Sequence, residues 1–62
     1  MSRDIEDSIA THQRLADEAL ARTKQADTTE AKRRAFYVYR TNKRKIQQLQ
    51  QLLQDKEELD QL

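Results

Sequence analysis

Glycine, proline and cysteine are all absent from this 62-residue sequence. Glycine and proline form turns and interrupt helices, so their absence favours helix along the whole chain. Without cysteine, neither a disulfide nor a thiolate metal site can stabilise the fold. Only 5% of the residues are aromatic and 37% are charged, which leaves little material for a globular core. These absences predict an elongated all-α protein that is marginally stable alone or stabilised by a second chain.

Long apolar segments and catalytic motifs are also missing. No apolar run approaches the length of a membrane span, and Met1-Ser2-Arg3-Asp4 does not open a signal peptide, so we expect a cytoplasmic protein. There is no phosphate-binding loop, nucleophile motif or metal-ligand cluster. His12, the one histidine, has no second ligand four residues away and is expected to be structural. The sequence therefore predicts a non-enzymatic protein without cofactor, metal or small-molecule substrate.

Apolar and small side chains repeat at alternating spacings of four and three residues, the heptad pattern of a coiled coil. In a first helix, expected over about residues 3–26 with Ser2 as its cap, they are Ile5, Ile9, His12, Ala16, Ala19, Thr23 and Ala26. In a second helix, expected over about residues 28–60, they are Ala31, Ala35, Val38, Asn42, Ile46 (or Lys45), Leu49 and Leu53. A polar Asn42 in this line either sets the register or leaves a solvent-wetted gap.

A turn is predicted near residues 27–29. Asp27-Thr28-Thr29-Glu30 has the pattern of a capping box, in which Asp27 caps the second helix and Glu30 returns a bond to the backbone of the cap. We therefore predict that residues 1–62 form one module, an all-α antiparallel coiled-coil hairpin of two helices. The alternative is a single helix of about 90 Å in a coiled-coil dimer.

The second helix is longer than the first, which can cover it only to about residue 51. Leu52, Leu53, Leu59 and Leu62 are then expected to lie uncovered. A row of exposed leucines indicates an unfinished interface, completed by a second copy in a homo-oligomer or by another protein.

Residues 32–45 contain seven basic side chains and no acidic one. At 100° per residue, Arg33, Tyr37, Arg40 and Arg44 share a face opposite the apolar line. We expect residues 40–45 to lie opposite residues 9–14, which carry no acid, so that this charge is not neutralised within the hairpin. Because arginine and tyrosine are enriched at interface hot spots, the face is a candidate binding surface. The predicted partner-binding residues are Arg33, Tyr37, Arg40, Lys43, Arg44, Lys45, Leu53 and Leu59.

The joint between the helices, Lys24-Gln25-Ala26-Asp27-Thr28-Thr29-Glu30-Ala31-Lys32-Arg33, resembles the joints of two families. One is the Rho-effector antiparallel coiled-coil finger, and the other is the basic helical hairpin of ESCRT-III-type membrane-remodelling proteins. The resemblance lies in helix lengths and charge pattern. The glycine that Rho-effector fingers usually carry late in the first helix has no counterpart near Asp17-Glu18-Ala19. Both families remain open on the sequence.

We expect a protein-protein interaction module that docks on an acidic or helical protein partner, such as a small GTPase or a trafficking or signalling component. One alternative is a basic helical protein that binds nucleic acid or anionic membrane through residues 32–45. Another is a structural coiled-coil segment for oligomerisation only. Binding driven by phosphate contacts weakens steeply with salt, whereas a leucine interface barely responds, so a salt titration separates these classes.

Overall fold

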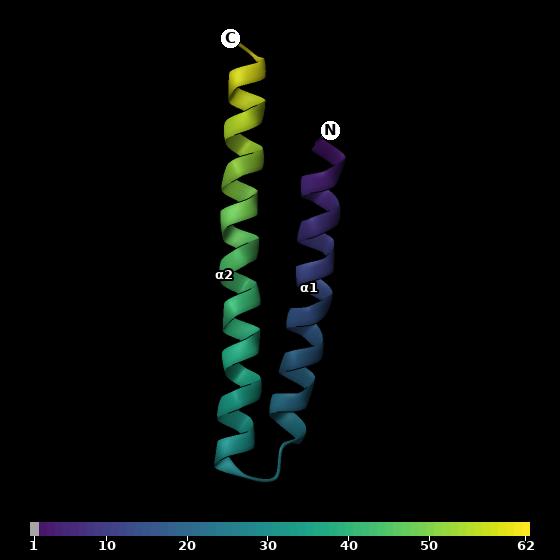
Figure 1. Cartoon of the computed structure of the whole chain (residues 1–62), viewed down its shortest axis with the longest axis vertical. Coiled ribbons are helices and arrows are strands. Elements are labelled where there is room, and N and C mark those ends of the chain that lie inside the picture. Colours follow the sequence, from purple (N-terminus) through teal and green to yellow (C-terminus); the bar gives the residue numbers. More distant parts are fainter. Residues whose placement is uncertain (1) are drawn as a thin grey trace.

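The chain is a helical hairpin (Figure 1). The structure, a computed structural model, describes the backbone from residue 2 and the side chains from residue 3 to residue 62. Helix α1 (Ser2–Gln25) and helix α2 (Thr29–Asp60) pack side by side and run in opposite directions. The predicted all-α hairpin is confirmed, and the single continuous helix is wrong. Each expected helix boundary lies within one residue of the observed one, and the predicted cap at Ser2 lies outside the described side chains.

The hairpin is elongated, and its two helices differ in length. The Cα atoms extend over 52 × 14 × 11 Å, and their radius of gyration is 14.8 Å, against about 11 Å for a compact domain of this size. Helix α1 has 24 residues and α2 has 32, a difference of about 12 Å at 1.5 Å per residue. The C-terminal end of α2 therefore extends beyond the start of α1 (Figure 1).

The turn at residues 26–28 forms without glycine because, in the part of the chain that the structure describes, no residue adopts a positive φ. Thr28 caps α2: its φ of −119° and ψ of 154° are extended, and its Oγ1 accepts a hydrogen bond from the Ala31 backbone nitrogen at 3.1 Å. The predicted cap at Asp27 is wrong, because the helix begins one residue later than that pattern requires. Glu30 instead accepts a hydrogen bond from Arg34.

The contact face of α1 is the predicted one. Every residue of its heptad line is buried or half-buried: Ile5, Ile9, His12, Ala16, Ala19, Thr23 and Ala26. Ala16 and Ala19 are 0% exposed. Side chains this small allow the backbones of two helices to approach closely at the middle of the hairpin.

The contact face of α2 differs from the prediction in its first half. Its buried and half-buried line is Ala35, Tyr39, Asn42, Ile46, Leu49, Leu53 and Lys56, which we call the hairpin seam of α2. Ala31 and Val38, both expected in this line, are exposed. Tyr39 takes the expected place of Val38, and the Phe36 ring stacks on it with centroids 5.6 Å apart. The stacked Phe36 ring covers part of Tyr39, whose large side chain lies beside the small side chains of α1.

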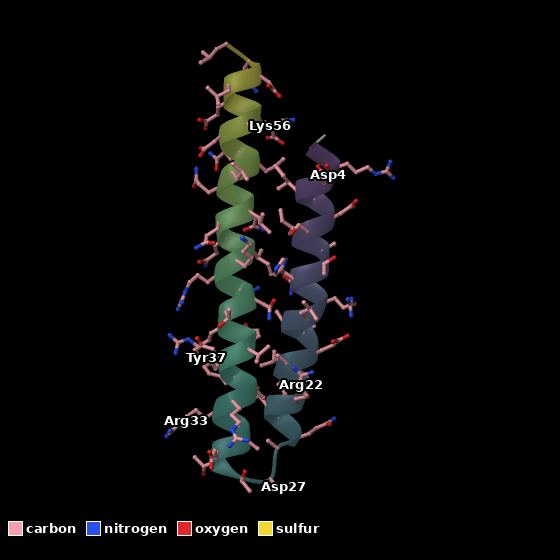
Figure 2. All side chains as sticks on the ribbon, in the orientation of Figure 1. Asp4, Arg22, Asp27, Arg33, Tyr37 and Lys56 are labelled. Atoms are coloured by element: carbon pink, nitrogen blue, oxygen red, sulfur yellow. The ribbon has the colours of Figure 1, made fainter. Side chains whose placement is uncertain are left out.

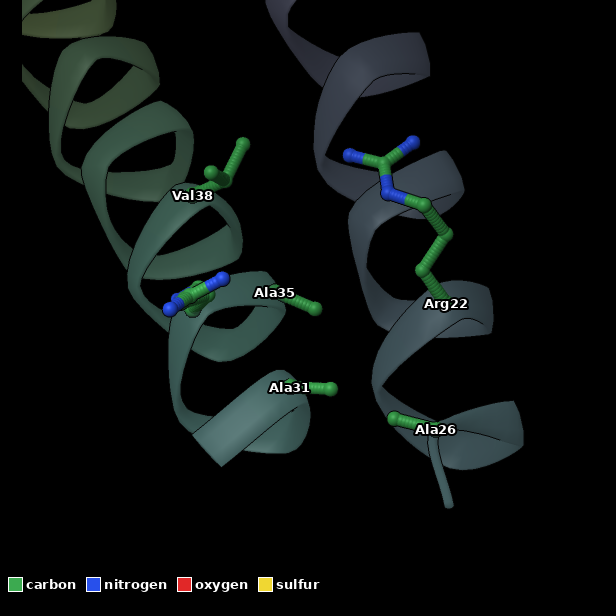
Figure 3. A pocket seen from close by; sticks show the side chains of 6 residues that line it. Arg22, Ala26, Ala31, Ala35 and Val38 are labelled. Atoms are coloured by element: carbon green, nitrogen blue, oxygen red, sulfur yellow. The ribbon is translucent and has the colours of Figure 1, made fainter. Parts of the chain in front are cut away.

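The residues that line an open groove beside the turn show which residues of the two helices face each other (Figure 3). Ala26, just after the end of α1, faces Ala31 of α2, and Arg22 lies level with Ala35, so the numbers of facing residues add up to about 57. By this register, residues 40–45 lie opposite about residues 12–17. The predicted pairing with residues 9–14 is wrong by roughly one helical turn, and the segment that faces residues 40–45 does contain an acid, Asp17.

Candidate functional site

Arg33, Tyr37, Arg40 and Arg44, which we call the basic stripe, are all exposed on α2. Tyr37 is 71% exposed although it is aromatic. Figure 2 shows Arg33 and Tyr37 on the side of α2 that faces away from α1. Because the hairpin seam lies on the opposite side of α2, none of these four side chains is needed to hold the helices together.

The cations of the basic stripe have no carboxylate partner within residues 3–62. The two ion pairs of that region are Arg14–Glu18 at 3.1 Å and Arg34–Glu30 at 2.8 Å, and each lies within a single helix. Asp17, which lies on α1 at about the level of Arg40, is exposed and accepts a hydrogen bond from Gln13 of its own helix at 2.9 Å. The positive charge of α2 is therefore not paired across the hairpin, as predicted, although the reason differs from the expected one.

The two predicted lysines lie on opposite flanks of the basic stripe. Lys43 is half-buried on the flank next to the hairpin seam, where its aliphatic stem can cover apolar surface while its ammonium group reaches water. Lys45 is exposed on the other flank. A partner that lies along the basic stripe could contact one lysine or the other, but a narrow helix would not contact both.

The two predicted leucines lie on different faces of α2. Leu53 is half-buried in the hairpin seam, so the expectation that it is uncovered is wrong: α1 reaches slightly further along α2 than residue 51. Leu52, Leu59 and Leu62 are exposed, Leu59 to 68%. At 100° per residue, Leu53 and Leu59 are separated by about 120° around the helix, so they do not form one patch.

The polar residues within the hairpin bond to their own helices. The Nδ1 atom of His12 donates to the carbonyl oxygen of Ser8 at 2.7 Å, and the Nδ2 atom of Asn42 donates to the carbonyl oxygen of Val38 at 2.9 Å. The bond to Ser8 gives His12 the structural role that the sequence indicates. Among the described residues, no cluster of three metal-ligating side chains occurs.

Neither helix, over the residues that the structure describes, is long and apolar enough to cross a membrane. Comparison of the chain with models of known protein families, with curated proteins and with solved structures gives no match.

Proposed function

We propose that this chain is a non-enzymatic protein-interaction module whose basic stripe docks on an acidic protein surface. The observation that carries the proposal is the position of Arg33, Tyr37, Arg40 and Arg44. They form one exposed line opposite the hairpin seam, and within residues 3–62 their charges have no acidic partner. A folded helix already holds the backbone of this line in place, so binding a partner costs side-chain entropy but little backbone entropy.

The composition of the basic stripe suits a protein surface. A guanidinium group binds a carboxylate through two parallel hydrogen bonds, which adds geometric specificity to charge attraction. Tyr37 lies between Arg33 and Arg40 and supplies apolar area together with a hydroxyl group, a combination enriched at hot spots. The stripe spans 11 residue steps, about 16 Å, which matches three turns of an acidic helix. The proposed partner is thus an acidic or helical protein surface, such as that of a small GTPase or a trafficking or signalling component.

Nucleic acid is the second candidate ligand, favoured by one specific observation. Phe36 and Tyr37 are both exposed beside the arginines, and proteins that bind single strands place aromatic side chains within a positive groove so that bases stack on them. The affinity for nucleic acid and the affinity for an acidic protein surface differ in how steeply salt lowers them. Affinity for nucleic acid falls steeply and linearly with the logarithm of salt concentration, by nearly one unit of slope for each neutralised phosphate.

Reversing the charge of the basic stripe is expected to abolish partner binding without unfolding the hairpin. In the variant Arg33→Glu/Arg40→Glu, two attractive contacts become repulsive, and we expect the affinity to fall about 100-fold. Both positions are exposed, so stability should change by less than about 0.5 kcal/mol for each substitution. The measurement is affinity capture from cell extract followed by titration of the retained protein.

The matched control is Arg3→Glu/Lys24→Glu, which makes the same charge change on exposed positions of α1 outside the ion pairs and should retain the partner. Tyr37→Ala should weaken binding with little change in salt dependence, since it removes apolar contact and no charge. Equal affinity of the wild type and the Arg33→Glu/Arg40→Glu variant for the same partner would show that the basic stripe is only a solvated surface. Retention of nucleic acid in place of protein would favour the second candidate.

A further inference from the structure

Helix α2 carries a second heptad line that α1 does not cover. Its positions alternate at spacings of three and four residues, and all eight are exposed: Val38, Thr41, Lys45, Gln48, Leu52, Asp55, Leu59 and Leu62. We call this line the second seam. It collects three exposed large apolar side chains of α2 and Leu62 just beyond its end, and it includes Val38, which the sequence pattern had assigned to the hairpin. The spacing of Val38, Leu52 and Leu59, at fourteen and then seven residues, is the sequence feature that marks it.

The second seam has the position that a further helix would need. Each of its first six residues immediately precedes a residue of the hairpin seam, and one step along an α-helix turns by 100°. The two seams therefore lie about 100° apart around α2. A helix that contacts two neighbours in a bundle has two such apolar lines, whereas a helix that contacts only α1 needs one.

We propose that the second seam of α2 packs antiparallel against the second seam of a second copy of this chain. In the proposed register, Val38 lies against Leu62 of the second copy, so apolar residues meet at both ends of the contact. Thr41 then lies against Leu59 of the second copy, and Gln48 against Leu52. Lys45 lies against Asp55 of the second copy. Each contact occurs twice, because a two-fold interface uses the same surface on both partners.

The charge distribution along α2 selects a second copy in this orientation. Residues 32–45 carry seven basic side chains and no acidic one, whereas residues 55–60 carry four acidic side chains and one basic. Antiparallel pairing places the basic end of each α2 on the acidic end of the other. A parallel pair would instead place Lys45 against Lys45 and Asp55 against Asp55. Like charges at such positions suppress the wrong pairing.

The antiparallel register also places unlike charges beside the seam. Arg44 lies within two residues, about 3 Å, of the level of Glu58 of the second copy, on the flank next to the basic stripe. A charged pair such as Lys45 with Asp55 contributes little affinity, but it fixes the register, because any slip would leave its charges unpaired. The contact covers residues 38–62, of which residues 38–60 are about 33 Å of helix, and it includes Leu59 and Leu62, which are exposed in the hairpin alone.

Self-association in this register leaves the N-terminal half of the basic stripe free. Arg33 and Tyr37 lie beyond the point where α2 of the second copy ends, because Leu62 of that copy reaches only Val38. The pair would therefore present two binding surfaces, one at each end. The interface and the proposed docking surface share Arg44 but are otherwise separate, so each can be disrupted alone.

The test is a charge exchange at the seam, measured by sedimentation equilibrium over a range of concentrations. Lys45→Glu alone and Asp55→Lys alone should each weaken self-association about 100-fold, tenfold for each of the two symmetric contacts, because like charges then meet. An equimolar mixture of the two single variants should associate as strongly as the wild type. In that mixed pair, Glu at position 45 meets Lys at position 55, and native Asp55 meets native Lys45.

The matched control is Lys32→Glu, which makes the same charge change as Lys45→Glu at an exposed position of α2 outside both the second seam and the basic stripe, and it should leave self-association unchanged. Circular dichroism establishes that all three variants remain helical. A wild-type chain that stays monomeric at millimolar concentration would overturn the inference, as would single variants that associate like the wild type. A mixture that associates no more strongly than either variant alone would also overturn it, since only the antiparallel pairing of Lys45 with Asp55 predicts rescue.

Discussion

Replacing Ala16 and Ala19 together with leucine is expected to separate the two helices of the hairpin. Both side chains are 0% exposed at the middle of the contact, where α2 places Tyr39 and Asn42 at about the same level. Forcing extra methylene groups into a packed contact typically costs about 1–3 kcal/mol at each position. A core this small rarely supplies more than about 3–5 kcal/mol in total, so the double substitution should remove most of the stability.

The measurement is thermal unfolding followed by circular dichroism at low micromolar concentration. The control is Ala10→Leu/Ala21→Leu, which adds the same atoms to exposed positions of α1 with the same small change in helix propensity. We expect the control to melt like the wild type and the Ala16→Leu/Ala19→Leu variant to lose its cooperative transition. A melting temperature equal to or above that of the wild type would show that the helices do not meet closely at the alanines.

Truncating Ile46 is expected to have the second largest effect on stability. Ile46 is 4% exposed and is the one large side chain among the buried residues in the described part of the chain. Replacing a buried isoleucine with alanine typically costs about 2–5 kcal/mol, through lost transfer free energy and the cavity left behind. The higher helix propensity of alanine offsets only a few tenths of this. For a domain of this size, each kcal/mol lowers the melting temperature by about 4–8 °C.

Gln47→Ala is the control for Ile46→Ala, because it introduces the same residue at the next, exposed position of α2. It should leave the melting temperature unchanged or slightly raised. If Ile46→Ala were as mild as Gln47→Ala, Ile46 would not be a buried contact between the helices.

The contact face of α1 could be predicted because only one face of that helix collects apolar and small side chains at heptad spacing. Ile5 and Ile9 define this heptad line, and Ala16 and Ala19 continue it. No other line along α1 contains as many apolar and small residues. In α2 the segment Phe36-Tyr37-Val38-Tyr39 contains four consecutive large residues, so several phases fit the sequence equally well. The choice of Tyr39 over Val38 depends on the space left by the alanines of α1 and on the ring of Phe36, neither of which is local to α2.

The cap of α2 is a second feature that the local sequence does not decide. Asp27 and Thr28 are adjacent, and both are residue types that cap helices well. Which of them does so depends on where the chain leaves α1, and the structure selects Thr28. The exposure of the basic stripe could be predicted from the face of α2 on which its residues lie. The partner of the stripe could not be predicted, because solvent-facing residues contribute little to the fold and the chain itself holds no complementary surface.

The most direct test of the account is an intramolecular distance between α1 and α2. Spin labels on cysteines introduced at Glu6 and Gln50 lie on exposed positions outside the basic stripe and the second seam. Dilution with unlabelled chain ensures that only labels within one molecule are measured. The hairpin predicts a separation within about 20 Å, since packed helices lie 8–10 Å apart and the labels add their own reach. A separation of about 66 Å, from 44 residues at 1.5 Å each, would mean that the chain does not fold back at residues 26–28.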